Sequence, residues 1–225
     1  MAVQSPLGTR LTVGVLLVLT GVTGLVDAVS YLRLNHVFVA NMTGNVVFLG
    51  FSANPHSGLS ALASLVAIAG FVLGALAGGR AAHTFAARRP AFWLASAFTV
   101  EAVIIALVAV LTGAGVLPFT GGGSYLTIAV LAAALGLQNS TVRHLGVADL
   151  TTTVLTLTLT GLAADNALAG GPGAKTRRRL ASVAAMLAGA AAGAALLEWS
   201  PSAVLGIAAV LVAAVAAAFT TGARG

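Results

Sequence analysis

Long apolar runs, separated by short polar stretches, organise the whole chain of 225 residues. Most of the runs approach the roughly 20 residues that a helix needs to cross about 30 Å of hydrocarbon. The pattern predicts an all-α integral membrane protein, and we expect the first run to be retained because it is long for a signal peptide. Eight apolar segments can be marked, at 11–32, 37–51, 58–82, 91–111, 125–142, 146–164, 180–197 and 203–219.

Polar residues interrupt two of the eight segments. Backbone that departs from a helix at membrane depth must be buried in protein or line a wet cavity. We therefore expect these two segments to be short re-entrant or broken helices beside about six full crossings. The interrupting residues are Asn41, Thr43, Gly44 and Asn45 in segment 37–51, and Asp149, Thr151, Thr152 and Thr153 in segment 146–164.

Composition places most of the chain in lipid. Hydrophobic residues make up 59% of it and charged residues only 7%, against about 25% charged residues in an ordinary globular domain. The net charge of +6 lies in short clusters at 80–89 and 175–179, between apolar runs, as positive-inside signals do. A nucleic-acid-binding face would show a basic stripe with interleaved aromatic residues. We predict the lipid bilayer as a partner and no nucleic acid.

The same basic clusters constrain the topology. If segments 37–51 and 146–164 each return to the side they came from, both clusters and Arg143 lie on one side with the two chain ends. If both segments crossed fully, Arg143 and the 175–179 cluster would face opposite sides. The positive-inside rule favours the first topology, which leaves only Arg33 on the other side.

The residue usage also bears on the location. Arginine greatly outnumbers lysine, and alanine and glycine are abundant, which is typical of a GC-rich bacterial genome. We predict a bacterial inner (plasma) membrane protein with cytoplasmic N- and C-termini.

Three crossings in each half would invert the second half relative to the first, as in many transporters. We expect one membrane domain built from two inverted repeats, 1–112 and 113–225, each with three crossings and one broken segment. A weak internal match supports this division, since Gly-Leu-Val-Asp at 24–27 aligns with Gly-Leu-Gln-Asn at 136–139. In this alignment Asp27 falls on Asn139 and, after a four-residue deletion, Asn41 falls on Asp149.

Acidic residues inside the apolar segments are functional candidates. A carboxylate within the membrane costs roughly 2.5–3.5 kcal/mol on insertion scales. Asp27 and Asp149 predict a central polar site, with proton or cation coupling as one use. The alternative is a structural ion pair, Asp27 with Arg143 or Asp149 with Arg33. Glu101 has no obvious partner, and we expect a structural role for it.

Positive residues precede both broken segments. Arg33 and His36 precede the first, and Arg143 and His144 precede the second. Together with half-helix N-termini they favour an anionic solute, whereas the alternative is that both arginines snorkel to the headgroups. The spacing of the histidines gives no cluster of metal ligands.

Threonine and glycine recur at helical spacing. Thr152, Thr156 and Thr160 share one helical face and either line a pore or bond back to their own helix. Glycines at every fourth position permit close approach of helices, inside the bundle or at the face of a homo-oligomer. These glycines are Gly70, Gly74 and Gly78, and Gly189 and Gly193.

Motifs for catalysis are missing from the sequence. The chain has no cysteine, no nucleophile motif, no phosphate-binding loop and no metal-binding spacing. We expect no enzyme activity, no catalytic residue, no metal and no cofactor.

Two stretches are similar to a known family. GLVDAVSYL at 24–32 and VFVANMTGN at 37–45 resemble the hallmark of the YoaK-like family of bacterial inner-membrane proteins of unknown function. The stretch at 136–139, with a threonine-rich segment after it, is also similar to that family, and the resemblance covers nearly the whole chain. It implies a multi-pass helical bundle and supplies no substrate.

Paired polar interruptions in matching halves predict a small-solute transporter or channel. The alternative is a non-transporting partner subunit or assembly factor, in which the polar residues only pack helices. On the transport hypothesis the two interruptions face each other near the midplane, and Asp27 and Asn139 buttress or complete the site. The predicted solute-binding residues are Asp27, Asn41, Thr43, Gly44, Asn45, Asn139, Asp149, Thr151, Thr152 and Thr153.

Overall fold

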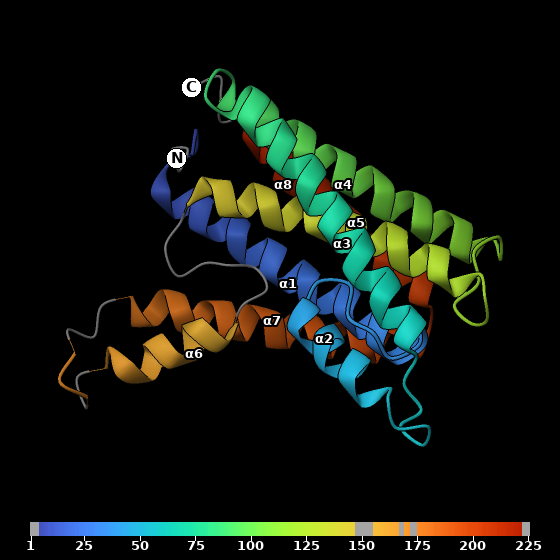
Figure 1. The fold of residues 1–225 in the computed structure, drawn as a ribbon. Coiled ribbons are helices and arrows are strands. Elements are labelled where there is room, and N and C mark those ends of the chain that lie inside the picture. Colours follow the sequence, from blue (N-terminus) through green and yellow to red (C-terminus); the bar gives the residue numbers. More distant parts are fainter. Residues whose placement is uncertain (1–4, 147–154, 167–168, 172–174, 222–225) are drawn as a thin grey trace.

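The computed structural model describes residues 5–146, 155–166, 169–171 and 175–221. Within these ranges the regular structure is entirely helical (Figure 1), which confirms the predicted all-α class. The helices are α1 (Thr9–Arg33), α2 (Met42–Phe51), α3 (Ala61–Ala81), α4 (Pro90–Gly113), α5 (Ser124–Leu145), α6 (Leu155–Ala164), α7 (Thr176–Leu196) and α8 (Pro201–Thr221), with a π-helical turn, η1 (Ala82–Ala86), after α3.

Six of the described helices are long and apolar enough to cross a membrane, and two are not. The short helices α2 and α6 have 10 residues each. At 1.5 Å per residue such a helix rises about 15 Å, half of the roughly 30 Å of hydrocarbon. Helix α2 therefore cannot span the membrane alone, as the polar interruption at 37–51 predicted, whereas residues 147–154, which precede α6, lie outside the described residues. Segment 37–51 is only partly helical, because α2 begins at Met42.

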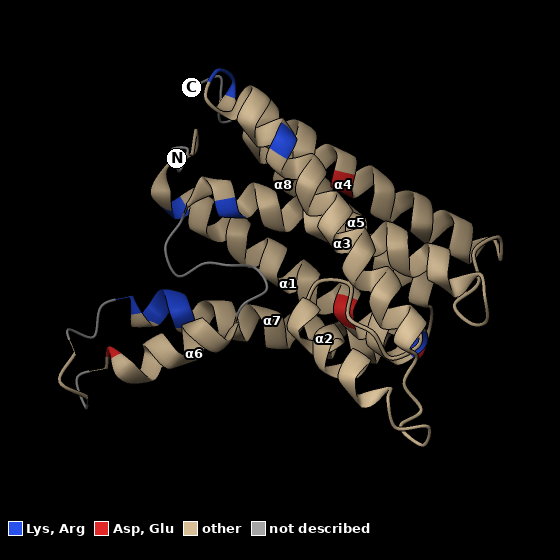
Figure 2. Cartoon of the chain, in the orientation of Figure 1, with Lys and Arg blue, Asp and Glu red and all other residues tan. Residues whose placement is uncertain are grey.

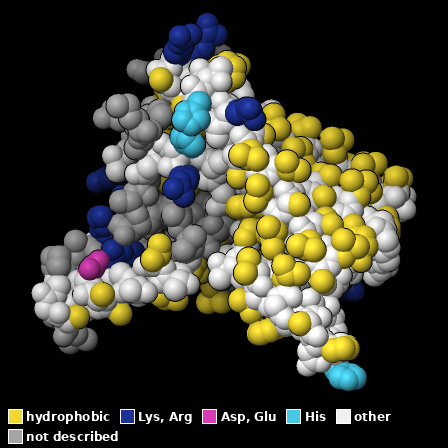
Figure 3. Space-filling model, viewed as in Figure 1, with side chains coloured by type: hydrophobic (Ala, Val, Ile, Leu, Met, Phe, Trp, Pro, Cys, Tyr) yellow, Lys and Arg dark blue, Asp and Glu magenta, His cyan; other side chains and the backbone are white. Residues whose placement is uncertain are grey.

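The long helices lie side by side, and most of the described basic residues gather at one end of them (Figure 2), with Arg33 at the other end, where α1 ends. Helices α1, α4 and α7 begin at this basic end, whereas α3, α5 and α8 end there (Figure 1). Apolar side chains cover the face over α3 and α4 (Figure 3). Leu73 on α3 and Val110 on α4 are 65% and 66% exposed. In a bilayer these exposed side chains contact lipid, so the chain has the surface of a multi-pass membrane protein.

Glycine brings α3 and α5 into backbone contact. A Cβ atom at Gly74 would lie 1.9 Å from the carbonyl oxygen of Ala133, and one at Gly136 would lie 2.1 Å from that of Phe71. Further along both helices, Gly78 faces Leu137. Contacts that advance together on both helices mean that α3 and α5 run parallel.

The pair α1 and α7 is built in the same way. A Cβ atom at Gly189 would lie 2.0 Å from the carbonyl oxygen of Gly21, and one at Gly193 would lie 3.0 Å from that of Leu25. These two helices also run parallel. The predicted packing role of both glycine series is confirmed, and it lies inside the bundle.

Helices α4 and α8 form the third pair and run antiparallel. The rings of Phe98 and Phe219 stack with centroids 5.7 Å apart near the basic end, while Gly113 faces Ser202 at the other end. Helix α8 also packs on α1, and α4 packs on α5, which joins the three pairs into one bundle. The short helix α2 lies against α3, and α6 lies against α7.

The glycine contacts give a first testable prediction. Gly74→Ala forces the backbones of α3 and α5 apart, and overpacking of this kind costs about 1–3 kcal/mol. Gly79→Ala, on the same helix, is the matched control because a Cβ atom there meets nothing within 4 Å. The midpoint of thermal unfolding in detergent should fall for Gly74→Ala and stay level or rise for Gly79→Ala. Equal midpoints for the two variants would contradict the close packing.

Candidate functional site

The segment between α1 and α2 folds back into the protein. It turns at Asn35 and His36, both with a φ of 56°, in the left-handed region that few side chains adopt. Val37, Val39 and Ala40 are buried beyond this turn. Non-helical backbone therefore lies buried within the protein beside α1, as polar backbone in a membrane requires.

Asp27 of α1 satisfies this backbone. Its Oδ1 accepts hydrogen bonds from the backbone N–H groups of Val39 and Ala40, each over 3.0 Å. The side-chain amide of Asn41 donates to its Oδ2. Asp27 is 5% exposed, and no described Lys, Arg or His contacts it. The carboxylate thus organises a loop without a cationic counter-ion.

Asn45, in the first turns of α2, completes the anchoring from the other side. Its Oδ1 accepts from the backbone N–H of Phe38 over 2.9 Å, and its Nδ2 donates to the carbonyl oxygen of the same residue over 2.5 Å. The side chain is fully buried. Asn45 therefore pairs both backbone groups of Phe38, as a neighbouring strand would do.

Aromatic rings pack around this loop. Tyr31 of α1 stacks on Phe38 with ring centroids 5.0 Å apart, and Phe38 stacks on Phe48 of α2 at 5.7 Å. Gly44 lets the ring of Phe38 lie against α2, since a Cβ atom there would be 2.6 Å from it. The three rings form one wall, which we call the aromatic wall.

A cavity of about 360 Å³ opens beside Asp27, between α1 and α7. Asp27 and Asn41 line it, together with Tyr31 and Phe38 of the aromatic wall. The opposite side is small and apolar, with Met186, Ala190 and Ala194 of α7. Asp27 lies six residues before the end of α1, so the cavity belongs to the half of the bundle away from the basic end.

The structure brings together the predicted site residues of the first half. Asp27 and Asn41 line the cavity, Gly44 and Asn45 support it, and Thr43 is exposed. Asn139 lies on α5, outside the cavity lining, and donates to the carbonyl oxygen of Leu135 over 3.0 Å. The remaining predicted residues, Asp149, Thr151, Thr152 and Thr153, lie outside the described residues.

The ion pair considered for Asp27 is not formed, because its hydrogen bonds go to the loop while Arg143 is exposed on α5. Arg33 is not among the residues that line the cavity, and it donates to the carbonyl oxygen of Leu197 over 3.3 Å. The alternative pair of Arg33 with Asp149 involves a residue outside the described ranges.

Helix α6 buries Thr158 and exposes Thr156 and Thr160. The described threonines of the face considered for a pore therefore do not face the protein, and Thr152 lies outside the described residues. Arg179 of α7 holds this helix by donating to the carbonyl oxygen of Gly161 over 2.6 Å and by pairing with Asp165 at 2.7 Å. The sequence indicated Arg179 only as part of a basic cluster that sets the topology. Its contact with Gly161 has no signature in the spacing or composition of the sequence.

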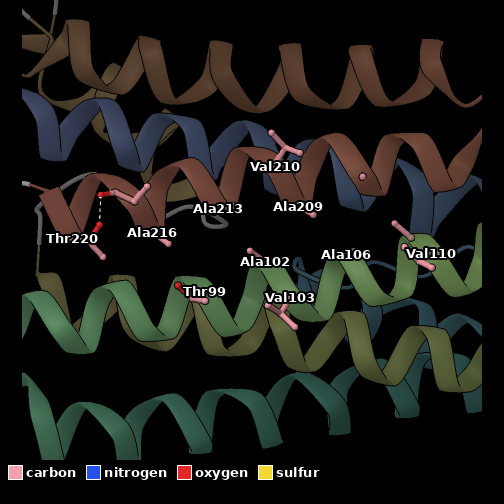
Figure 4. Close-up of a pocket in the computed structure, with 13 residues that line it drawn as sticks. Thr99, Ala102, Val103, Ala106, Val110, Ala209, Val210, Ala213, Ala216 and Thr220 are labelled. Atoms are coloured by element: carbon pink, nitrogen blue, oxygen red, sulfur yellow. Dashed lines mark hydrogen bonds between the residues drawn. The ribbon is translucent and has the colours of Figure 1, made fainter.

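A second cavity, of about 530 Å³, lies between α4 and α8 (Figure 4). Small apolar side chains such as Ala106, Ala209 and Ala213 line most of it, with Thr99 and Thr220 as the hydroxyl-bearing residues. The hydroxyl of Thr220 donates to the carbonyl oxygen of Ala217 in its own helix. None of the described charged side chains lines this cavity. Glu101 of α4 is fully buried, and neither carboxyl oxygen has a hydrogen-bond partner among the described residues.

Comparisons with known proteins agree with the resemblance predicted from residues 24–45. A family model described as a protein of unknown function (DUF1275) matches residues 15–218. The chain is 34% identical over 150 residues to the UPF0700 transmembrane protein YoaK of Bacillus subtilis (strain 168). The matched stretch covers 63% of this chain and 61% of YoaK, less than two thirds of either. No solved structure matches the chain significantly.

Removal of the Asp27 carboxylate should release the loop. Asp27→Ala leaves the N–H groups of Val39 and Ala40 unpaired, at about 1–3 kcal/mol each, whereas Asp27→Asn keeps one acceptor. Hydrogen exchange of the amides of residues 37–41 should accelerate strongly in the alanine variant and less in the asparagine variant. Thr43→Ala, at an exposed position, is the control. Unchanged exchange in Asp27→Ala would show that the loop does not depend on this carboxylate.

Proposed function

We propose that this chain, which belongs to the DUF1275 family, is a small-solute transporter or channel and not an enzyme. The cavity between α1 and α7 is its solute-binding site. The observation that carries the proposal is the short, broken segment 37–51, which places hydrogen-bonded, non-helical backbone and a buried carboxylate at the edge of a cavity. Discontinuous helices with such backbone form the sites of many secondary transporters.

The helix contacts support an inverted repeat in this proposal. Gly21 and Leu25 of α1 meet Gly189 and Gly193 of α7. Their counterparts 112 residues later, Ala133 and Leu137 of α5, meet Gly74 and Gly78 of α3. One set of contacts is therefore the image of the other when α1 is exchanged with α5 and α7 with α3.

The remaining packing follows the same exchange. The contact of α4 with α5 corresponds to that of α8 with α1, and that of α2 with α3 corresponds to that of α6 with α7. Helices α4 and α8 correspond to each other and lie together. Since equivalent helices run in opposite directions, the two halves 1–112 and 113–225 would be related by a two-fold axis in the membrane plane.

Charge asymmetry orients the protein in this proposal. Most of the described basic residues gather at one end of the bundle (Figure 2), and cytoplasmic loops carry the excess of Lys and Arg. The protein then lies in a bacterial plasma membrane with both termini in the cytoplasm, and the Asp27 cavity belongs to the outer half.

Single cysteines test this topology, because the chain has no native cysteine. Asn54→Cys and Gly121→Cys should label in intact cells with a membrane-impermeant maleimide, since both residues lie at the end opposite the basic one. Gly8→Cys and Arg88→Cys should label only after the membrane is permeabilised. All four positions are exposed. The opposite labelling pattern would invert the assignment, and a mixture of the two would refute the six crossings.

Transport is tested in proteoliposomes with a panel of labelled amines, amino acids, sugars and carboxylates. We expect flux of at least one class, and Asn41→Ala should reduce that flux about tenfold or more because it removes a polar group from the cavity. Ala192→Leu, on an exposed face of α7 outside the cavity lining, should transport as the wild type does. Flux that survives Asn41→Ala would refute the residue assignment.

A non-transporting partner subunit is the second candidate function. The fully buried carboxyl group of Glu101, which has no hydrogen-bond partner among the described residues, is as compatible with helix packing as with transport. Folded, reconstituted protein that moves no member of the panel, together with purification that always yields a second polypeptide, would favour this candidate over transport.

A further inference from the structure

The cavity between α1 and α7 offers two oxygen atoms with acceptor capacity, on Asp27 and Asn41. The N–H groups of Val39 and Ala40 and the amide of Asn41 all donate to Asp27. A carboxylate has about four acceptor positions, so Asp27 keeps one for a ligand. The Oδ1 of Asn41 receives no hydrogen bond from any described residue. A ligand that pairs with these two oxygens must bring its own donors, while the second N–H of the Asn41 amide and the Tyr31 hydroxyl are further polar groups of the lining.

The charge that lines the cavity is also of one sign, negative. Among the described residues, Asp27 is the one charged residue of the cavity lining, and none of the described Lys, Arg or His residues lines it. Arg33, the nearest arginine along the chain, donates to Leu197 instead. An ionised carboxylate buried without a counter-ion is unfavourable, and a bound cation removes that cost.

The aromatic wall adds a second attraction for positive charge. Tyr31 and Phe38 line the cavity and stack on each other through one face, and a ring face that no other ring covers attracts cations, with ammonium groups as the typical ligands. The volume of about 360 Å³ lies near the lower limit of roughly 300–1,000 Å³ for ligand pockets. The space therefore fits a small organic ion.

We infer that the cavity binds a small ammonium or alkylammonium ion. Asp27 supplies the opposite charge, Asn41 Oδ1 accepts a hydrogen bond, and Tyr31 and Phe38 contact the apolar groups of the ion. This assignment names the solute class of the proposed transporter, and it rests on that proposed function for its physiological meaning. It differs from the anionic solute expected from Arg33 and the half-helix N-terminus, because Asp27 already takes the place in front of α2 that an anion would occupy.

Calorimetric titration of the purified protein in detergent tests the inference without any flux. The probes are methylammonium and tetramethylammonium chloride, with sodium acetate and sodium phosphate as anionic comparisons in a constant sodium chloride background. The wild type should bind at least one ammonium probe and neither anion. Asp27→Asn should raise the Kd of the ammonium probe about tenfold or more, since it removes the charge.

A second variant leaves the hydrogen bonds of Asp27 intact. Ala194→Leu places a larger side chain in the cavity from α7. The space left for the ion shrinks, so binding should weaken to a similar extent. Two matched controls should bind as the wild type does. Glu198→Gln removes the same charge from an exposed position at the same end of the bundle, and Ala192→Leu adds the same volume to α7 outside the cavity lining.

The outcomes separate this inference from the proposed function. A wild type that binds no ammonium probe, or Asp27→Asn and Ala194→Leu variants that both bind as the wild type does, would overturn the cation site. Transport of a neutral or anionic solute without competition by the ammonium probes would overturn it too, while leaving transport intact. Ammonium binding that depends on Asp27, in a protein that moves no solute, would support the site and refute transport.

Discussion

The structure depends on one constraint, the need to pair every backbone polar group that lies within the membrane. A long helix meets this need by itself, but the segment 34–41 does not, because it is not helical. Asp27 pairs the N–H groups of Val39 and Ala40, and Asn45 pairs both polar groups of Phe38. These two side chains permit a loop where lipid alone would forbid one. The position of α2, the aromatic wall and the cavity all follow from them.

In the second half of the chain, the short helix α6 is also held in place by a charged side chain, but through different hydrogen bonds. Helix α6 is held to α7 by Arg179, which donates to the carbonyl oxygen of Gly161 and pairs with Asp165. A Cβ atom at Gly161 would lie 2.7 Å from the guanidinium carbon of Arg179, so a larger residue there would displace the end of the arginine side chain. A carboxylate that accepts from N–H groups thus anchors the short segment of the first half, and a guanidinium that donates to a carbonyl group anchors that of the second. The two halves share a packing scheme more closely than they share polar contacts.

Much of the fold could be predicted from the sequence because hydrophobic length and charge placement act at the scale of whole helices. These two features were sufficient to predict six long helices, two shorter helical segments and the end of the bundle at which the basic residues gather. The site was predictable only in part. Asp27 and Asn41 stood out because polar residues are rare in apolar segments, but the groups that Asp27 would meet did not. Backbone N–H groups carry no sequence signal, so an ion pair with Arg143 seemed equally reasonable.

Side-chain direction was the second limit of sequence reasoning. Thr156, Thr158 and Thr160 alternate with leucine, and the sequence does not say which side of a short helix meets the protein. The structure buries Thr158. The aromatic wall was missed for a related reason, since Tyr31, Phe38 and Phe48 have no common period and meet only because the chain turns at Asn35 and His36.

The close pairs α1–α7 and α3–α5 each join a helix from one half of the chain to a helix from the other. Neither glycine face can therefore be covered before synthesis has reached the second half. During synthesis, the contact faces of α1 and α3 therefore remain uncovered until α5 and α7 have been inserted. The arrangement resembles a domain swap between two molecules. A half-length chain with this pattern could cover these faces only by pairing with a second copy inserted in the opposite orientation.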